Sequence, residues 1–202
     1  MQNRTDPPEL EKGLDFTSRE LLNMSLASLV IYLAIATLLF WFFHEGDLFG
    51  AFDSEFSLGM QLLYGTGAGT AAAGVIAFFS SIPPVKNALN DFSIFRILSN
   101  TTFSWPDRIQ VSFFAGVGEE LLFRGAIQPL IGIWFTSLIF IAIHGYIGFR
   151  SAGQILFTVL LFGLSMLLGW LFMAIGLVAA MTAHAVYDLL MLWWVSLRKK
   201  SG

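Results

Sequence analysis

The chain contains no cysteine and few charged residues. The lack of Cys excludes disulfide bonds, thiolate metal sites and cysteine nucleophiles. Only 12% of the 202 residues are charged, whereas soluble domains carry about 25%. With 56% hydrophobic residues the chain is also too apolar for a disordered protein. A formal net charge of −3 without a long basic run predicts no nucleic-acid partner. The composition predicts an integral membrane protein that sits in a lipid bilayer.

The charged residues are separated by apolar gaps that are long enough to cross a membrane. A bilayer core about 30 Å thick requires roughly 20 apolar residues in a helix. The gaps predict single spans over 21–43 and 58–79 and pairs of spans within 109–149 and 151–197. We expect the run at 109–149 to divide at Pro129 and Gly132, and the run at 151–197 to divide at Gly176.

We therefore expect one membrane domain over residues 1–202. Its predicted fold class is all-α: a polytopic integral membrane helical bundle of about six transmembrane helices. Residues 1–20 form a polar segment with more acidic than basic side chains, which is not the pattern of a cleavable signal peptide. Residues 85–99 mix apolar and charged positions in the manner of an interfacial amphipathic helix.

The loops predict an orientation, because Lys and Arg favour the cytoplasmic side. The 44–57 loop has four acidic residues and neither Lys nor Arg, so we expect it outside. The 82–108 segment, Arg150 and the basic tail at 198–200 are expected inside. An even number of spans then places the N- and C-termini in the cytoplasm.

A run of small residues, Gly65-Thr66-Gly67-Ala68-Gly69, lies inside the second predicted span. No Lys follows it, and it lacks the strand–loop–helix setting of a phosphate loop. Gly65, Gly69 and Ala73 are four residues apart, a spacing that lets membrane helices approach closely. We interpret the run as a helix-packing face.

Ionisable side chains inside the predicted spans are the main indication of function, because such groups cost several kcal/mol in a bilayer. The predicted spans hold six of them: Glu119, Glu120, Arg124, His144, His184 and Asp188. A hydrogen-bonded core histidine or a structural ion pair would explain single members, but not the whole set. We assign His44, at the end of a span, to structure. The six residues are the predicted site.

The spacing of these residues suggests how they are arranged. Glu120 and Arg124 are four apart and share a helix face on which they can pair. Glu119 is rotated about 100° from Glu120 and can act as a base near His144. His184 and Asp188 are also four apart, so both can face one cavity.

Several known protease motifs are absent. Gly163-Leu164-Ser165-Met166 is not the Gly-x-Ser-Gly of rhomboid-type serine proteases, and neither Gly-x-Gly-Asp nor His-Glu-x-x-His occurs. A water activated by glutamate, with histidines as polarising or oxyanion donors, remains open. Two His and one Glu could equally form a catalytic metal site. The sequence therefore leaves the metal and any other cofactor unassigned.

Three motifs resemble those of the CPBP intramembrane proteases, the family of CAAX proteases and bacteriocin-processing enzymes. Glu119-Glu120-Leu121-Leu122-Phe123-Arg124-Gly125 is similar to the Glu-Glu-x-x-x-Arg motif of that family. Phe140-x-x-x-His144 and His184-x-x-x-Asp188 resemble its second and third motifs. They occur in the family's order within residues 109–195, which form the expected family core.

The resemblance implies an endopeptidase that hydrolyses a membrane-associated protein or peptide. Glu119 would activate water with help from His144, Glu120 and Arg124 would support it, and His184 with Asp188 would stabilise the oxyanion. Many prenyl-protein proteases of the family have Asn at the position of Asp188, which puts prenylated CAAX substrates in doubt. The short chain resembles the bacterial branch, which implies a multi-pass protein of the bacterial inner membrane.

Two other functions are compatible with the same residues. A non-catalytic membrane partner, such as an immunity or assembly protein, could keep the fold, although loss of a motif residue would be expected and none is lost. A proton or cation transporter could use the carboxylates and histidines as a relay, but internal repeats are expected in many such transporters. No repeat is found in this chain.

Overall fold

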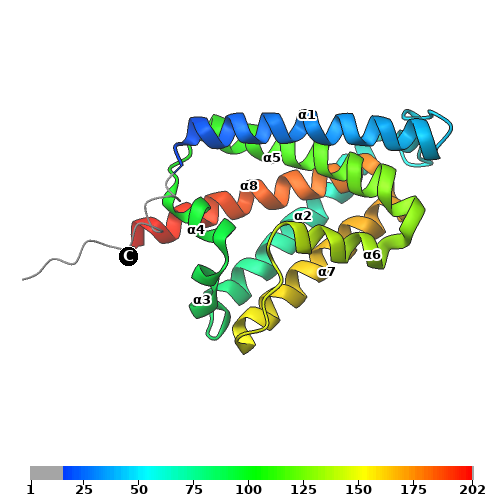
Figure 1. Ribbon diagram of the computed structural model, residues 1–202. Coiled ribbons are helices and arrows are strands. Elements are labelled where there is room, and N and C mark those ends of the chain that lie inside the picture. Colours follow the sequence, from blue (N-terminus) through cyan, green and yellow to red (C-terminus); the bar gives the residue numbers. More distant parts are fainter. Residues whose placement is uncertain (1–15, 202) are drawn as a thin grey trace, which may run out of the picture.

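The computed structural model describes residues 16–201, and the side chains of residues 16–198. Most of the predicted polar segment at 1–20 lies outside the described residues. The helices are α1 (Ser18–Phe43), α2 (Leu58–Ser81), α3 (Val85–Ala88), α4 (Ser93–Asn100), α5 (Trp105–Glu120), α6 (Gln128–Ile143), α7 (Ala152–Ala174) and α8 (Leu177–Ser201). Short 3₁₀ turns lie at Gly50–Phe52 and Leu89–Asp91, and a π-helical segment, η4, covers Leu121–Ile127. Residues 16–201 contain no strand, which confirms the all-α fold class (Figure 1).

Side chains in the loops determine where the long helices begin. Thr17 and Glu20 form a capping box at α1, and Ser104 with Asp107 forms another at α5. Ser57 and Ser151 cap α2 and α7 through their hydroxyl oxygens. Such caps satisfy backbone N–H groups that have no partner within the helix.

Within residues 16–201, five helical stretches are long and apolar enough to cross a membrane. One of them, Trp105–Ile143, is 39 residues long, and Gly132 interrupts it with φ 79° and ψ 165°. α5 and α6 consequently run in opposite directions (Figure 1). The expected division of this run at Gly132 is confirmed, and the count agrees with about six crossings. Gly176, with φ +131°, forms the expected turn between α7 and α8.

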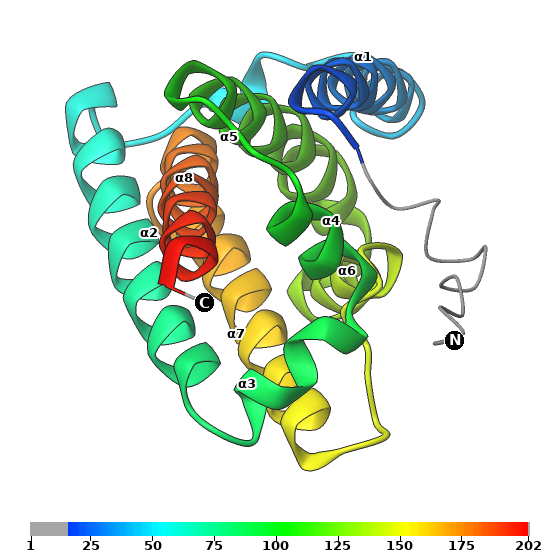
Figure 2. The ribbon, with the colours of Figure 1, turned by 90° about the vertical axis from the view of Figure 1, so that its left-hand side faces the viewer.

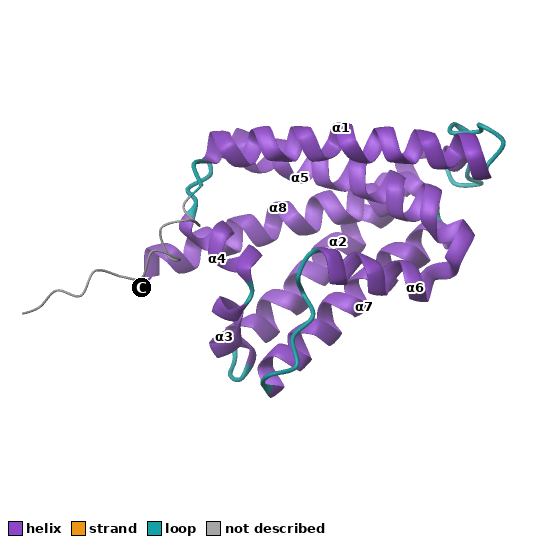
Figure 3. Cartoon of the chain, in the orientation of Figure 1, coloured by secondary structure: helices purple, strands orange, loops and turns teal. Residues whose placement is uncertain are grey.

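The helix after the Gly132 break is shorter than expected. Residues 133–143 extend about 16 Å at 1.5 Å per residue, roughly half of a bilayer core. His144 directly follows this helix, and residues 144–151 form a loop that leads to α7 (Figure 3). The sequence predicted His144 within a span, whereas the structure places it where a short helix ends.

The small residues of α2 pack against α8, as their spacing predicted. A Cβ added at Gly65 would lie 2.6 Å from the carbonyl oxygen of Ala179, and one at Gly69 would overlap the backbone of Ala183. On the opposite side of α8, a Cβ at Gly116 of α5 would lie 2.7 Å from the carbonyl oxygen of Met181. α8 therefore lies between α2 and α5, close to both (Figure 2).

The segment predicted to be amphipathic, residues 85–99, folds into α3, a 3₁₀ turn and α4. Four of its apolar side chains are buried, namely Val85, Ala88, Leu89 and Phe92. Its basic side chains, Lys86 and Arg96, are exposed. The amphipathic pattern is confirmed, while its position at a membrane interface stays a prediction.

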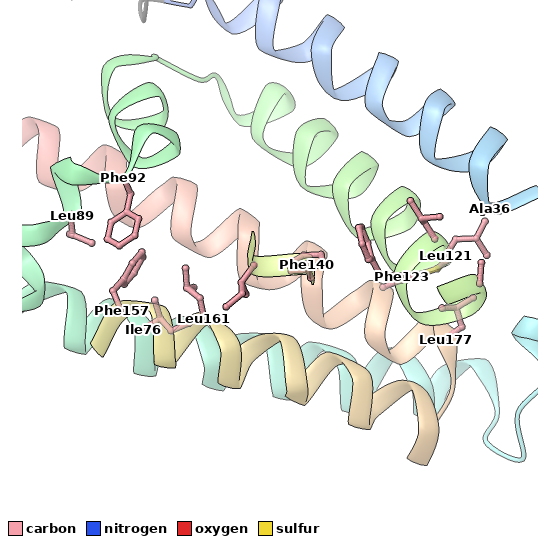
Figure 4. Packing of buried hydrophobic residues seen from close by; sticks show 14 of the residues in the cluster. Ala36, Ile76, Leu89, Phe92, Leu121, Phe123, Phe140, Phe157, Leu161 and Leu177 are labelled. Atoms are coloured by element: carbon pink, nitrogen blue, oxygen red, sulfur yellow. The ribbon is translucent and has the colours of Figure 1, made fainter. Parts of the chain in front are cut away.

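Aromatic side chains link the ends of the buried core. Phe92 packs against Phe157 with ring centroids 5.0 Å apart, and Phe123 packs edge-on against Phe140 at 5.1 Å. Figure 4 shows Phe140 between the Phe92–Phe157 pair and Phe123. Phe140 is therefore near the middle of the core.

The α2–α8 contact predicts different effects of the same substitution at two neighbouring glycines. Gly69→Ala should lower the thermal stability of the detergent-solubilised protein, because overpacking a close contact costs about 1–3 kcal/mol. Gly67→Ala is the matched control, since a Cβ at Gly67 meets no atom within 4 Å. Equal melting temperatures for the two variants would contradict the close packing of these helices.

Candidate active site

The structure brings together all six residues that the sequence singled out. Glu119 and Glu120 end α5, Arg124 lies in the π-helical segment η4, His144 follows α6, and His184 and Asp188 lie one turn apart on α8. A π-helical turn widens the helix, and such turns are frequent at functional sites. Four segments of the chain therefore contribute to one cluster.

The innermost contact is the ion pair between Glu120 and Arg124, which the sequence predicted. Both side chains are fully buried, and Nε of Arg124 donates to Oε2 of Glu120 at 3.0 Å. A second nitrogen of Arg124, Nη2, donates to the hydroxyl of Ser165 on α7 at 2.8 Å. The guanidinium carbon lies 5.3 Å from the ring centroid of Phe140. The cation is thus held by a carboxylate, a hydroxyl and an aromatic face.

Glu120 uses its other oxygen to orient a histidine. Oε1 of Glu120 accepts a hydrogen bond from Nδ1 of His184 at 2.8 Å. A carboxylate can only accept, so this bond places a proton on Nδ1 and directs Nε2 away from Glu120. Nε2 lies 3.6 Å from Oδ2 of Asp188 and 3.9 Å from Oε2 of Glu119. The carboxylates of Glu119, Glu120 and Asp188 therefore lie around His184.

Glu119 points away from the buried ion pair, as its rotation on the helix predicted. Its Oε2 lies 3.2 Å from Nε2 of His144. Nδ1 of His144 donates to the carbonyl oxygen of Phe140 at 2.7 Å. Nε2 must therefore also carry a proton to make a favourable contact with the Glu119 carboxylate. Within residues 16–198, Oε2 of Glu119 accepts no hydrogen bond of good geometry. Its contact with His144 is thus close but poorly aligned.

These groups line a cavity of about 210 Å³ that is otherwise largely apolar. Glu119, His144, His184 and Asp188 face it, together with two tyrosines, Tyr146 and Tyr187. The remaining lining side chains are apolar and come from α4, α5, α6, α7 and α8. Charges in such a setting interact more strongly than in water. The cavity can therefore hold an apolar chain segment against polar groups.

The donor types also bear on the metal that the sequence left open. Two His and one Glu occur together, but within the described residues no group of three His, Asp or Glu side chains has an arrangement that could hold a metal ion. The described geometry therefore does not fit a metal site.

Sequence reasoning missed several supporting residues. Ser165 belongs to the string rejected as a protease motif, and it is instead the partner of Arg124. No sequence motif includes Tyr146 or Thr158. Tyr146 lies in the loop after α6 and Thr158 lies on α7, so local spacing does not connect either of them with the site. His44 has the structural role expected of it, since its Nε2 lies 2.9 Å from the carbonyl oxygen of Ala126.

Removing the buried cation should destabilise the protein. Arg124→Leu leaves Glu120 buried without a counter-charge, and breaking a buried pair costs about 3–5 kcal/mol. Thermal unfolding in detergent should show a clear drop in melting temperature. The exposed Arg150 supplies the control, because Arg150→Leu removes a cation that has no such role. An Arg124→Leu protein as stable as the wild type would disprove the pairing.

Comparisons with known proteins agree with the three motifs. Residues 101–190 match the family model described as type II CAAX prenyl endopeptidase Rce1-like. The uncharacterised protein YpbD of Bacillus subtilis (strain 168) is 30% identical over 161 residues, which cover 79% of this chain and 81% of YpbD. The sporulation-killing factor biosynthesis protein SkfC of the same organism is 27% identical over 158 residues, 69% of this chain and 31% of SkfC. No solved structure matches. The chain is a multi-pass membrane protein that belongs to the Rce1-like family, the CPBP intramembrane proteases.

Proposed function

We propose that the protein is an intramembrane endopeptidase that hydrolyses a peptide bond with a water activated by Glu119. The observation that carries the proposal is the position of this carboxylate. It faces an apolar cavity, contacts His144 and has a buried oxygen without a well-aligned hydrogen bond in the described part of the chain. Membership in a protease family supports the same reaction class.

Glu119 is suited to act as the general base. Its ionised carboxylate would accept a proton from a water held between the carboxylate and the scissile carbonyl carbon. His144, 3.2 Å away, would hold the carboxylate in place and share the proton that the water gives up. The proton can then pass to the leaving amine, which completes hydrolysis.

His184 is suited to stabilise the oxyanion that forms when the water attacks. Its Nε2 is directed into the cavity by the bond between Nδ1 and Glu120. A protonated Nε2 is a preorganised donor, and such donors act on charge that develops in the transition state. Asp188, at 3.6 Å, would orient this imidazole, while Glu120 and Arg124 would fix it from behind.

The substrate follows from the cavity lining and from the family. A largely apolar cavity between helices favours an apolar segment of a membrane-associated protein or peptide. The alternative of a non-catalytic partner does not require a free carboxylate in a cavity, and a transporter does not require an oxyanion donor. We place the enzyme in the bacterial inner membrane, with both termini in the cytoplasm.

Glu119→Gln should abolish most of the cleavage. Gln keeps the size of the side chain but cannot accept the water's proton, and loss of a general base lowers rates by roughly 10²–10⁴-fold. Comparative mass spectrometry of membrane proteins from cells with the wild type or the variant would reveal the lost products. Glu55→Gln, at an exposed loop position, is the matched control. Identical products from wild type and Glu119→Gln would contradict proteolysis and favour the non-catalytic alternative.

Two substitutions of Asp188 separate its hydrogen-bonding role from its charge. Asp188→Asn keeps the shape and one acceptor oxygen, so it should retain much of the activity. Asp188→Leu offers no hydrogen bond, and losing support of an oxyanion donor costs about 10²–10³ in rate. The rates of both variants on one natural substrate decide the point. If Asn were as inactive as Leu, the carboxylate charge itself would be required.

A further inference from the structure

The ring of His144 stacks with two aromatic side chains. The ring of Phe140, one helical turn earlier, stacks on it with centroids 4.4 Å apart and an angle of 30° between the planes. The ring of Tyr146, two residues later, lies nearly parallel to it, with centroids 5.8 Å apart and planes 6° apart. Tyr146 is outside the three family motifs, and nothing in the proposed reaction uses it.

The backbone of Tyr146 is itself held in place from α7. The hydroxyl of Thr158 donates to the carbonyl oxygen of Tyr146 at 2.7 Å and accepts from the N–H of Gly148 at 3.0 Å. Oε1 of Gln154 accepts from the N–H of Arg150 at 2.9 Å, and its Nε2 donates to Asp91 at 2.8 Å. Thr158 and Gln154 are both buried. The loop after His144 is thus fixed at three backbone groups.

We propose that Tyr146 is a positioning residue for His144, whose stacked ring keeps Nε2 of His144 directed at Glu119. The inference rests on the proposed function, since His144 and Glu119 act together there. It assigns a role to a residue that touches neither the water nor the scissile bond in the proposed mechanism.

The need for such a residue follows from where His144 lies. A histidine within a helix is restrained by the turns on either side, but His144 follows the last residue of α6. Its bond from Nδ1 to the carbonyl oxygen of Phe140 fixes one atom and leaves the ring free to rotate about that bond. The stacked rings of Phe140 and Tyr146 oppose this rotation. Phe140 is tilted by 30° to the imidazole, whereas the ring of Tyr146 is nearly parallel to it and matches its plane more closely.

Tyr146 could also act through its hydroxyl, because it lines the cavity that Glu119 and Asp188 also face. Stacking depends on the ring alone, whereas a donor role depends on the oxygen. Phe at position 146 keeps the first and removes the second. The two roles therefore predict opposite results for one substitution.

The kinetic test compares Tyr146→Phe and Tyr146→Leu with the wild type on a substrate found by the Glu119→Gln comparison. Tyr146→Leu should lower kcat on the order of 10²-fold, the scale for misplaced catalytic groups, with KM unchanged. Tyr146→Phe should keep kcat within about 3-fold of the wild type, because small changes outside the reacting groups cost little. Thr158→Val, which frees the loop, should lower kcat in the same direction. Tyr64→Leu, on the exposed side of α2, is the control and should leave kcat unchanged.

A second measurement does not depend on cleavage. In the full-length protein labelled with ¹³C-histidine in detergent, the ring protons of His144 should be shifted by the neighbouring aromatic rings, and loss of one signal in His144→Asn assigns them. Tyr146→Leu should move this signal, whereas Tyr146→Phe and Tyr64→Leu should leave it in place.

The results separate the two proposals. A Tyr146→Leu protein with wild-type kcat, a Phe variant as slow as the Leu variant, or an unmoved His144 signal in Tyr146→Leu would each overturn the positioning role. If the wild type cleaves nothing while the His144 signal moves as expected, the proposed function fails and the orientation of His144 by Tyr146 stands.

Discussion

A fully buried guanidinium is the constraint on which the rest of the site depends. Arg124 has no exposed surface, and an unpaired charge at such a position would cost many kcal/mol. Its pairing with Glu120 removes that cost only when the geometry is good and further hydrogen bonds are made. The hydroxyl of Ser165 and the ring of Phe140 provide further contacts to the guanidinium in addition to Glu120. The packing of η4 against α7 is therefore tied to the same cation as the polar site.

The ion pair also determines what the two adjacent glutamates can do. Glu120 is engaged with both oxygens, one at Arg124 and one at His184. Glu119 lies about 100° further round the helix and cannot reach the cation, so it faces the cavity instead. Two neighbouring residues of one chemical type thus acquire different roles through helix geometry: one carboxylate fixes a histidine, and the other remains available to accept a proton.

The sequence was sufficient for the features that depend on local spacing. Pairs four residues apart, such as Glu120 with Arg124 and His184 with Asp188, share a helix face in any context, and the glycines of α2 were recognised in the same way. It was insufficient where partners are distant in the chain. Ser165 is 41 residues from Arg124, and nothing in the local pattern joins them. The sequence predicted a longer helix at this point because apolar residues continue past Ile143, where α6 ends.

The two histidines of the site are supported in different ways, and this difference bears on how a helical membrane protein builds a reactive centre. His184 is held within α8, and its ring is fixed by a bond to a fully buried carboxylate. His144 follows the end of α6, beside the cavity that its side chain lines. Ending the helix there removes the restraint that a following turn would provide. Aromatic faces and a loop hydrogen-bonded to α7 restore it, without adding charge to an apolar surrounding. The loop that follows the end of α6 beside the cavity thus also holds His144 in place.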